Sequence, residues 1–184
     1  MNSFYNPKEH YYKSEKLTHT IHENSDCFTQ FKNIGWTLGN DCPYRCRHCY
    51  SMSAREKGMN LTTTMVDRVI NEIKKLTPRT INLGGNEPLY TNGIDPQKSL
   101  LPYIIKKIRE IGADVGLTSS GITVVYLANH CQEEFSLLND IDISIDSPIK
   151  KEHNSNRGYE IFDLACDALK KCQENNISRT IIMC

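Results

Sequence analysis

Three cysteines near the start of the chain are the residues whose types and spacing point most directly to chemistry. Cys42, Cys46 and Cys49 are separated by three and then two residues, and they follow the apolar segment 34–38. Thiolates are soft ligands that favour iron–sulfur clusters, zinc or copper(I). One loop therefore carries three ligands for a metal centre, and the fourth position of that centre is left without a cysteine.

Two common metal sites fit this set of ligands poorly. A structural zinc site has four ligands, usually in two pairs from separate segments, and no second pair of cysteines follows at a finger-like spacing. His48 is a candidate fourth ligand, but adjacent residues such as His48 and Cys49 rarely both reach one tetrahedral ion. A bacterial ferredoxin needs a fourth cysteine soon after the third, and the next one here is Cys131. A four-iron cluster with one open iron fits the count better.

Two kinds of apolar segment alternate after residue 33. Short apolar runs, typical of buried strands, lie at 34–38, 80–83, 115–118, 141–146 and 178–183. Apolar residues at helical spacing lie between Thr62 and Pro78, and at 101–111, 124–131 and 159–174. Strands that alternate with amphipathic helices predict βα units and a parallel sheet, so we predict an α/β fold.

Polar and small residues follow the end of each of the first four predicted strands. The cysteine loop follows the first strand, and Gly84-Gly85-Asn86-Glu87-Pro88 follows the second. Ser119-Ser120-Gly121 follows the third strand, and Ser144 and Asp146 lie at the end of the fourth. Right-handed crossovers place the C-terminal ends of parallel strands on one edge, and in barrel-like α/β folds that edge carries the chemistry. We therefore expect these residues to share one rim.

The cysteine spacing and the glycine-rich segment together resemble the radical S-adenosylmethionine (SAM) superfamily. In that family a C-x3-C-x2-C motif follows the first strand and a Gly-Gly-Glu-Pro motif follows the second; here Asn86 stands before Glu87. The resemblance covers residues 34–184. It implies a partial (β/α) barrel with about five βα units present and the sixth missing. We expect a polar lead-in over residues 1–30 and a radical SAM core over 31–184, truncated at the fifth strand.

The resemblance also implies cofactors and the residues that hold them. Cys42, Cys46 and Cys49 would bind a [4Fe–4S] cluster, and SAM would chelate its open iron through amino and carboxylate groups. Gly84 and Gly85 lack side chains, so their backbone can approach SAM closely. Glu87 would accept a hydrogen bond from SAM or order its own loop.

Further SAM contacts are expected along the rim. His48 would lean against the adenine or pack against the cluster loop. Ser119 (or Ser120), Ser144 and Asp146 would hydrogen-bond the ribose hydroxyls or the methionine end, although capping a turn before Pro148 is a plainer role for Asp146. Arg157 would pair with the SAM carboxylate, for which its planar fork is suited. The sequence assigns no catalytic residue.

The implied activity is that of an oxidoreductase that reductively cleaves SAM to a 5′-deoxyadenosyl radical, which abstracts hydrogen from a substrate. Segment 144–158 resembles the peptide-maturing branch of the family, so the substrate is expected to be a peptide, a protein or a small molecule. An electron donor of the flavodoxin or ferredoxin type is implied. The alternative is a truncated or split, non-catalytic iron–sulfur and SAM-binding module that needs a partner chain.

Bulk composition favours neither a nucleic-acid nor a membrane partner. The 184 residues include 22 basic and 22 acidic side chains, which gives a formal net charge of zero. The N-terminus has no hydrophobic signal region, and no stretch approaches the roughly 20 apolar residues of a membrane span, so we expect a cytoplasmic protein. In such a compartment the remaining cysteines are expected to be buried thiols rather than disulfides. They are Cys131, Cys166, Cys172 and Cys184; Cys27 and the histidines His10, His19 and His22 are expected at the surface.

Overall fold

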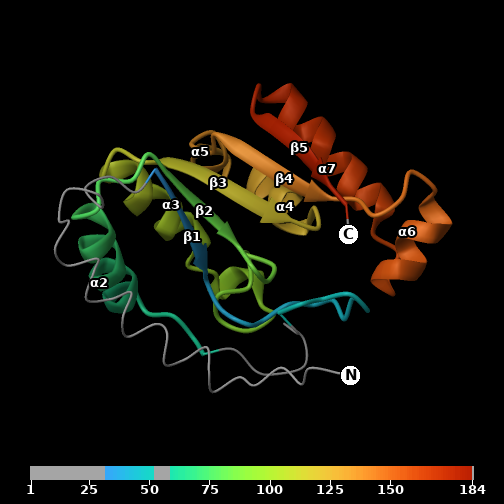
Figure 1. The fold of residues 1–184 in the computed structure, drawn as a ribbon, viewed down its shortest axis with the longest axis horizontal. Coiled ribbons are helices and arrows are strands. Elements are labelled where there is room, and N and C mark those ends of the chain that lie inside the picture. Colours follow the sequence, from blue (N-terminus) through green and yellow to red (C-terminus); the bar gives the residue numbers. More distant parts are fainter. Residues whose placement is uncertain (1–31, 52–58, 184) are drawn as a thin grey trace, which may run out of the picture.

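The computed structural model describes residues 32–51 and 59–183, which form one sheet with helices packed against it. The sheet has five parallel strands in the order β1-β2-β3-β4-β5, and Figure 1 shows them side by side in that order. The strands are β1 (Asn33–Thr37), β2 (Thr80–Gly84), β3 (Asp114–Ser119), β4 (Asp140–Ser144) and β5 (Ser178–Ile182). The predicted α/β fold with a parallel sheet is confirmed, and the predicted lead-in 1–30 lies outside the described residues.

The four longest helices match the four predicted helical segments. They are α2 (Thr63–Lys74), α3 (Leu101–Glu110), α4 (Ile122–His130) and α7 (Phe162–Glu174). Thr62 caps α2, because its side chain accepts a hydrogen bond from the Met65 N–H. Gly112 follows α3 with a φ of 83°, a conformation that glycine adopts without strain.

Three short helical segments were not predicted. They are η2 (Pro96–Lys98), α5 (Gln132–Phe135) and α6 (Lys150–Arg157). The sequence of α6, KKEHNSNR, has no apolar residue, so it carries no hydrophobic period. Its buried residues are instead His153, Asn154 and Arg157. They make polar contacts with the rest of the chain, and the His153 ring also packs edge-on against Phe162.

The helices bury one face of the sheet. Because neighbouring strands follow one another along the chain, right-handed crossovers place their helices on the same side. Alternate strand residues therefore form a core with the apolar stripes of the helices. The core includes Ile81, Leu83, Val115, Leu117, Ile141 and Ile143 from the sheet, and Val66, Ile70, Ile104, Ile108, Leu127 and Ala168 from the helices.

Two details of the predicted burial were wrong. Val69 and Leu76, two of the apolar residues at helical spacing between Thr62 and Pro78, are 37% and 39% exposed. Leu76 lies beyond the end of α2, and the buried stripe consists of Val66, Ile70 and Ile73. Among the thiols predicted to be buried, Cys172 is buried, whereas Cys131 and Cys166 are partly exposed.

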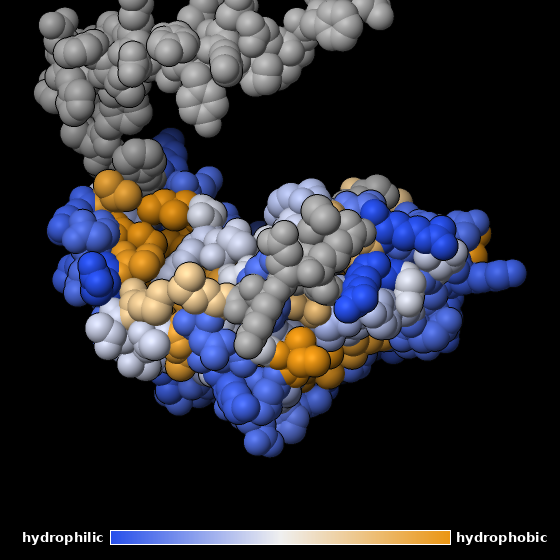
Figure 2. All heavy atoms as spheres, turned by 90° about the horizontal axis from the view of Figure 1, so that it is seen from below, coloured by the Kyte–Doolittle hydropathy of each residue, from blue (hydrophilic) through white to orange (hydrophobic). Residues whose placement is uncertain are grey.

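One face of the molecule mixes hydrophilic and hydrophobic side chains. Figure 2 shows a face that is mostly hydrophilic, with hydrophobic residues gathered in separate patches. None of the helices in the described part of the chain is long and apolar enough to cross a membrane.

Candidate functional site

The predicted site residues meet at the C-terminal edge of the sheet. A cavity of about 180 Å³ there is lined by all three loop cysteines and by most of the predicted SAM contacts. The predicted lining residues are Cys42, Cys46, Cys49, His48, Gly85, Glu87, Ser119, Ser144 and Arg157. Gly84 and Asp146 lie behind this lining: Gly84 is beside Thr118, and Asp146 binds Arg157. The strand-end residues thus share one rim, as the topology predicted.

Several lining residues were missed by the sequence analysis. They are Tyr44, Tyr50, Ser51, Asn86, Thr118 and Ile182, while Ser120 had been named as an alternative to Ser119. Thr118 and Ile182 lie at strand ends, and Tyr44 lies inside the cysteine loop, so their positions in the sequence could have predicted that they line the site. Asn86 was treated only as an additional residue within a motif.

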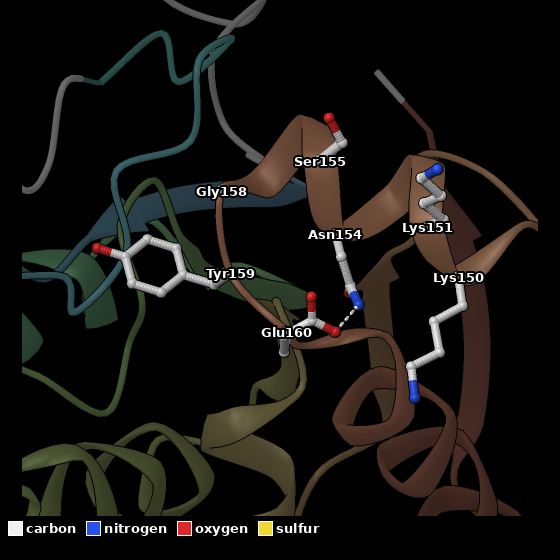
Figure 3. A pocket seen from close by; sticks show the side chains of 7 residues that line it. All are labelled: Lys150, Lys151, Asn154, Ser155, Gly158, Tyr159 and Glu160. Atoms are coloured by element: carbon white, nitrogen blue, oxygen red, sulfur yellow. Dashed lines mark hydrogen bonds between the residues drawn. The ribbon is translucent and has the colours of Figure 1, made fainter.

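A larger cavity of about 570 Å³ lies beside α6 and is less suited to chemistry. Its lining is Lys150, Lys151, Asn154, Ser155, Gly158, Tyr159 and Glu160 (Figure 3). None of the described cysteines lines it. The Lys150 ammonium is bound to Asp163 at the surface, and Figure 3 shows the two lysine side chains diverging. The cysteine-lined cavity is therefore the candidate site.

The cysteine loop presents thiols of different exposure to the cavity. Cys46 is buried, whereas Cys42 and Cys49 are partly exposed. The loop turns tightly, because the Cys49 N–H donates to the Cys46 carbonyl over 3.3 Å. Burial raises the pKa of the Cys42 thiol to about 12. Burial also raises the pKa of the Cys46 thiol, although the positive charge of Arg157 acts to lower that pKa. Such thiols become thiolates once a metal centre supplies positive charge.

Asn86 ties the glycine-rich loop to the cysteine loop. Its Nδ2 donates to the carbonyl of Asp41 over 3.0 Å and to the carbonyl of Glu87 over 3.3 Å. These two donations fix the orientation of the amide. Its Oδ1 is buried and has no hydrogen-bond partner among the residues that the structure describes. Asn86, which lines the cavity, therefore carries a free acceptor.

Gly85 occupies a position that a side chain would block. Its φ is +91°, a conformation that favours glycine. A Cβ atom there would lie 2.5 Å from the Oγ1 of Thr37. The glycine therefore lets the loop after β2 pass close to the end of β1, beside the cysteines.

Glu87 joins the loops that follow β2 and β3. It is 3% exposed. Its Oε1 accepts from the Ser119 hydroxyl over 2.5 Å and also from the Thr123 hydroxyl. Its Oε2 accepts from the N–H and the hydroxyl of Ser120, over 3.0 and 2.6 Å. A carboxylate offers about four lone-pair sites, so this chain fills the acceptor capacity of Glu87. The geometry favours its loop-ordering role.

Asp146 and Arg157 form a buried pair at the far side of the cavity. Arg157 Nε donates to Asp146 Oδ2 over 2.8 Å, and Nη2 donates to Oδ1 over 2.5 Å. The third nitrogen, Nη1, lies 4.0 Å from the Cys46 sulfur. His48 Nε2 lies 3.7 Å from Asp146 Oδ2, so it approaches the same carboxylate from the cysteine loop.

Comparison with known families places the chain. Residues 35–161, more than half of the sequence, match the family described as "4Fe-4S single cluster domain". The chain belongs to the radical SAM superfamily. The cofactors of that superfamily are a [4Fe–4S] cluster and SAM, as predicted.

The relatives of this radical SAM chain are distant. A probable GTP 3′,8-cyclase of Pyrococcus abyssi is 23% identical over 139 residues, which cover 76% of this chain and 42% of the relative. Mycofactocin maturase MftC of Mycolicibacterium smegmatis is 25% identical over 137 residues, 74% of this chain and 33% of the relative. The structure of Streptococcus suis SuiB bound to S-adenosylmethionine has a TM-score of 0.65 at 14% identity, and covers 98% of this chain and 40% of SuiB. This radical SAM chain thus spans less than half the length of each of these three relatives.

The residues present fit the superfamily's cofactors better than they fit a single metal ion. Within residues 32–51 and 59–183, no group of three or more His, Cys, Asp or Glu side chains is placed to hold one ion. His48 therefore does not complete a zinc site with the three cysteines. A four-iron cluster distributes its thiolates over separate irons, so its ligands can lie farther apart than the ligands of a single ion. The free Oδ1 of Asn86 supplies an acceptor of the kind that the amino group of SAM needs.

Proposed function

We propose that this chain binds a [4Fe–4S] cluster through Cys42, Cys46 and Cys49 and holds SAM in the adjoining cavity for reductive cleavage. When bound, the two cofactors supply the 5′-deoxyadenosyl radical that takes a hydrogen atom from a substrate. The observation that carries the proposal is that all three thiols line one cavity together with a buried, unpaired acceptor, Asn86 Oδ1. The electron comes from a donor of the flavodoxin or ferredoxin type.

In this proposal each wall of the cavity has its own part in binding SAM. Asn86 accepts from the SAM amino group, and Gly85 allows the backbone to approach. Ser144 and His48 also line the cavity, and we assign them to the ribose and the adenine. Ser119 and Glu87 position the loops, because their polar groups already bind one another. Asp146 orients Arg157 rather than contacting SAM directly.

Replacing Asn86 by alanine is expected to weaken SAM binding by tenfold or more. A hydrogen bond to a charged group contributes about 1.5–3 kcal/mol, and tenfold corresponds to about 1.4 kcal/mol. Equilibrium binding of SAM to the reconstituted protein measures the change. The control is Asn71→Ala on the exposed side of α2, which should bind SAM as the wild type does. Equal SAM affinity in the Asn86 and Asn71 variants would remove Asn86 from the site.

The substrate is proposed to lie against the polar face of the sheet. Thr118 lines the cavity, and its hydroxyl donates to Asp142 Oδ2 over 3.4 Å. Both residues alternate with core residues of β3 and β4, so they belong to the face turned away from the core. We propose a peptide as the substrate. SuiB, which shares the fold at 15% identity, has also been solved bound to its precursor peptide SuiA. The relative named as a probable GTP 3′,8-cyclase suggests the competing class of substrate, a small nucleotide.

The exposed edge of β5 favours a second candidate, a non-catalytic module that works with a partner segment. No described strand pairs with the outer edge of β5. Ile181 is 51% exposed and Met183 is 64% exposed. Such an edge is a template for pairing with another strand. A module of this kind would bind the cluster and SAM without cleaving SAM.

One experiment tests the proposed function against this module. The protein is reconstituted anaerobically with iron and sulfide, reduced with dithionite and incubated with SAM, and 5′-deoxyadenosine is quantified. We expect cluster absorbance and 5′-deoxyadenosine that depends on dithionite. SAM binding without 5′-deoxyadenosine would favour the non-catalytic module, and a chain that takes up no cluster would refute both.

A further inference from the structure

The guanidinium of Arg157 is held in one orientation beside a cluster ligand. Two of its nitrogens bind both oxygens of Asp146, whose side chain is fully buried. A bidentate pair of this kind fixes direction as well as distance. The remaining nitrogen, Nη1, faces the sulfur of Cys46 at 4.0 Å. The pair as a whole is neutral, but its positive end is the end that meets the cysteine.

The two ends of the pair are anchored independently of any ligand. The Asp146 N–H donates to Nδ1 of His153 over 3.1 Å. His153 and Arg157 are four residues apart, so they share one face of α6. Asn154, on the same helix, accepts from the N–H groups of Ile161 and Phe162 over 3.1 and 3.0 Å. Figure 3 shows its amide also donating to Glu160. α6 is thus fixed to the start of α7, and Arg157 cannot swing away easily.

We propose that Arg157, oriented by Asp146, raises the reduction potential of the cluster by presenting its guanidinium to the sulfur of Cys46. This inference rests on the proposed function, because it needs the cluster that Cys46 would hold. Reduction adds one negative charge to the cluster, and a nearby positive group stabilises that charge. Charge and hydrogen bonds near the sulfurs are known determinants of cluster potential. Arg157 is only 8% exposed, so water screens its charge weakly.

This role differs from pairing with the carboxylate of SAM. If Arg157 paired with the SAM carboxylate, its removal would change the affinity for SAM but would not change the reduction potential of the SAM-free cluster. A group that acts on the cluster sulfur changes the potential without SAM. The potential of the SAM-free cluster therefore separates the two roles.

The test compares Arg157→Gln with Arg47→Gln, each in the reconstituted protein without SAM. Arg47 lies next to Cys46 in the sequence but is exposed, so its variant removes an equal charge beside the same cysteine from a position that water screens. Redox titration followed by the electron paramagnetic resonance of the reduced cluster gives the midpoint potential. We expect R157Q to make reduction about tenfold less favourable, a fall of about 59 mV for one electron, and R47Q to stay near the wild type.

Removing Arg157 alone leaves the Asp146 carboxylate buried without its partner, and an unpaired buried charge strongly destabilises a folded protein. If R157Q therefore takes up no cluster, the double variant Asp146→Asn with Arg157→Gln replaces it, because it leaves no unpaired buried charge. A smaller lowering of the potential is expected there, because the double variant removes a neutral pair whose positive end faces Cys46 and leaves no negative charge behind. A potential equal to that of R47Q would overturn the inference while leaving the proposed function intact. A wild-type chain without a cluster would overturn both.

Discussion

Replacing Cys46 by alanine is expected to abolish cluster assembly and, with it, SAM cleavage. Cys46 is the buried member of the three thiols, and the loop turns around it through the hydrogen bond between the Cys49 N–H and the Cys46 carbonyl. Two remaining thiols supply too few ligands for three irons. We expect the absorbance of the reconstituted cluster to disappear and 5′-deoxyadenosine to fall at least 100-fold, measured anaerobically with dithionite and SAM.

The matched control for this variant is Cys166→Ala. Cys166 is a partly exposed free thiol on α7, and it does not line the cavity. It should keep full cluster absorbance and full 5′-deoxyadenosine formation. If Cys46→Ala retained SAM cleavage, or if Cys166→Ala lost it, the assignment of the cluster to this loop would be wrong.

The strands and long helices were predictable because apolar periodicity alone determines them. The three central strands, β2, β3 and β4, have apolar residues that the helices bury, such as Ile81 and Leu83 in β2, and the helices carry matching stripes. α6 was not predictable in this way. It is stabilised by polar contacts from His153, Asn154 and Arg157, and a sequence pattern does not show which partners such residues will meet.

The site was predictable as a rim of residues but not as a network of contacts. A parallel sheet brings the C-terminal ends of its strands together whichever side chains they carry. Because each motif follows a strand, the sequence predicted which segments would line the cavity. The pairing of Asp146 with Arg157 depends on the orientation of α6. The free acceptor of Asn86 depends on where its Nδ2 finds partners. Both are consequences of tertiary packing, which the sequence does not display.

Replacing Glu87 by alanine is expected to destabilise the protein strongly. The hydroxyls that Glu87 binds are themselves acceptors: Ser119 Oγ accepts from the Gly121 N–H over 2.8 Å, and Thr123 Oγ1 accepts from the Leu89 N–H over 3.2 Å. Their protons are therefore directed at Glu87 and cannot easily turn elsewhere. Loss of the carboxylate leaves several buried donors unpaired, at about 1–3 kcal/mol each.

We expect Glu87→Ala to lower the free energy of unfolding by about 4 kcal/mol and the melting temperature by about 8–16 °C, since 1 kcal/mol shifts a domain of this size by about 2–4 °C. Glu87→Gln retains an oxygen for the donors of Ser120, so about half that loss is expected. Thermal unfolding followed by circular dichroism measures both. Glu110→Ala, at the exposed end of α3 beside Lys107, is the control and should change stability by less than about 0.5 kcal/mol. If the Glu87→Ala melting curve matched that of Glu110→Ala, the loops after β2 and β3 would be held by packing alone. Glu87 would then be available to accept a hydrogen bond from SAM directly.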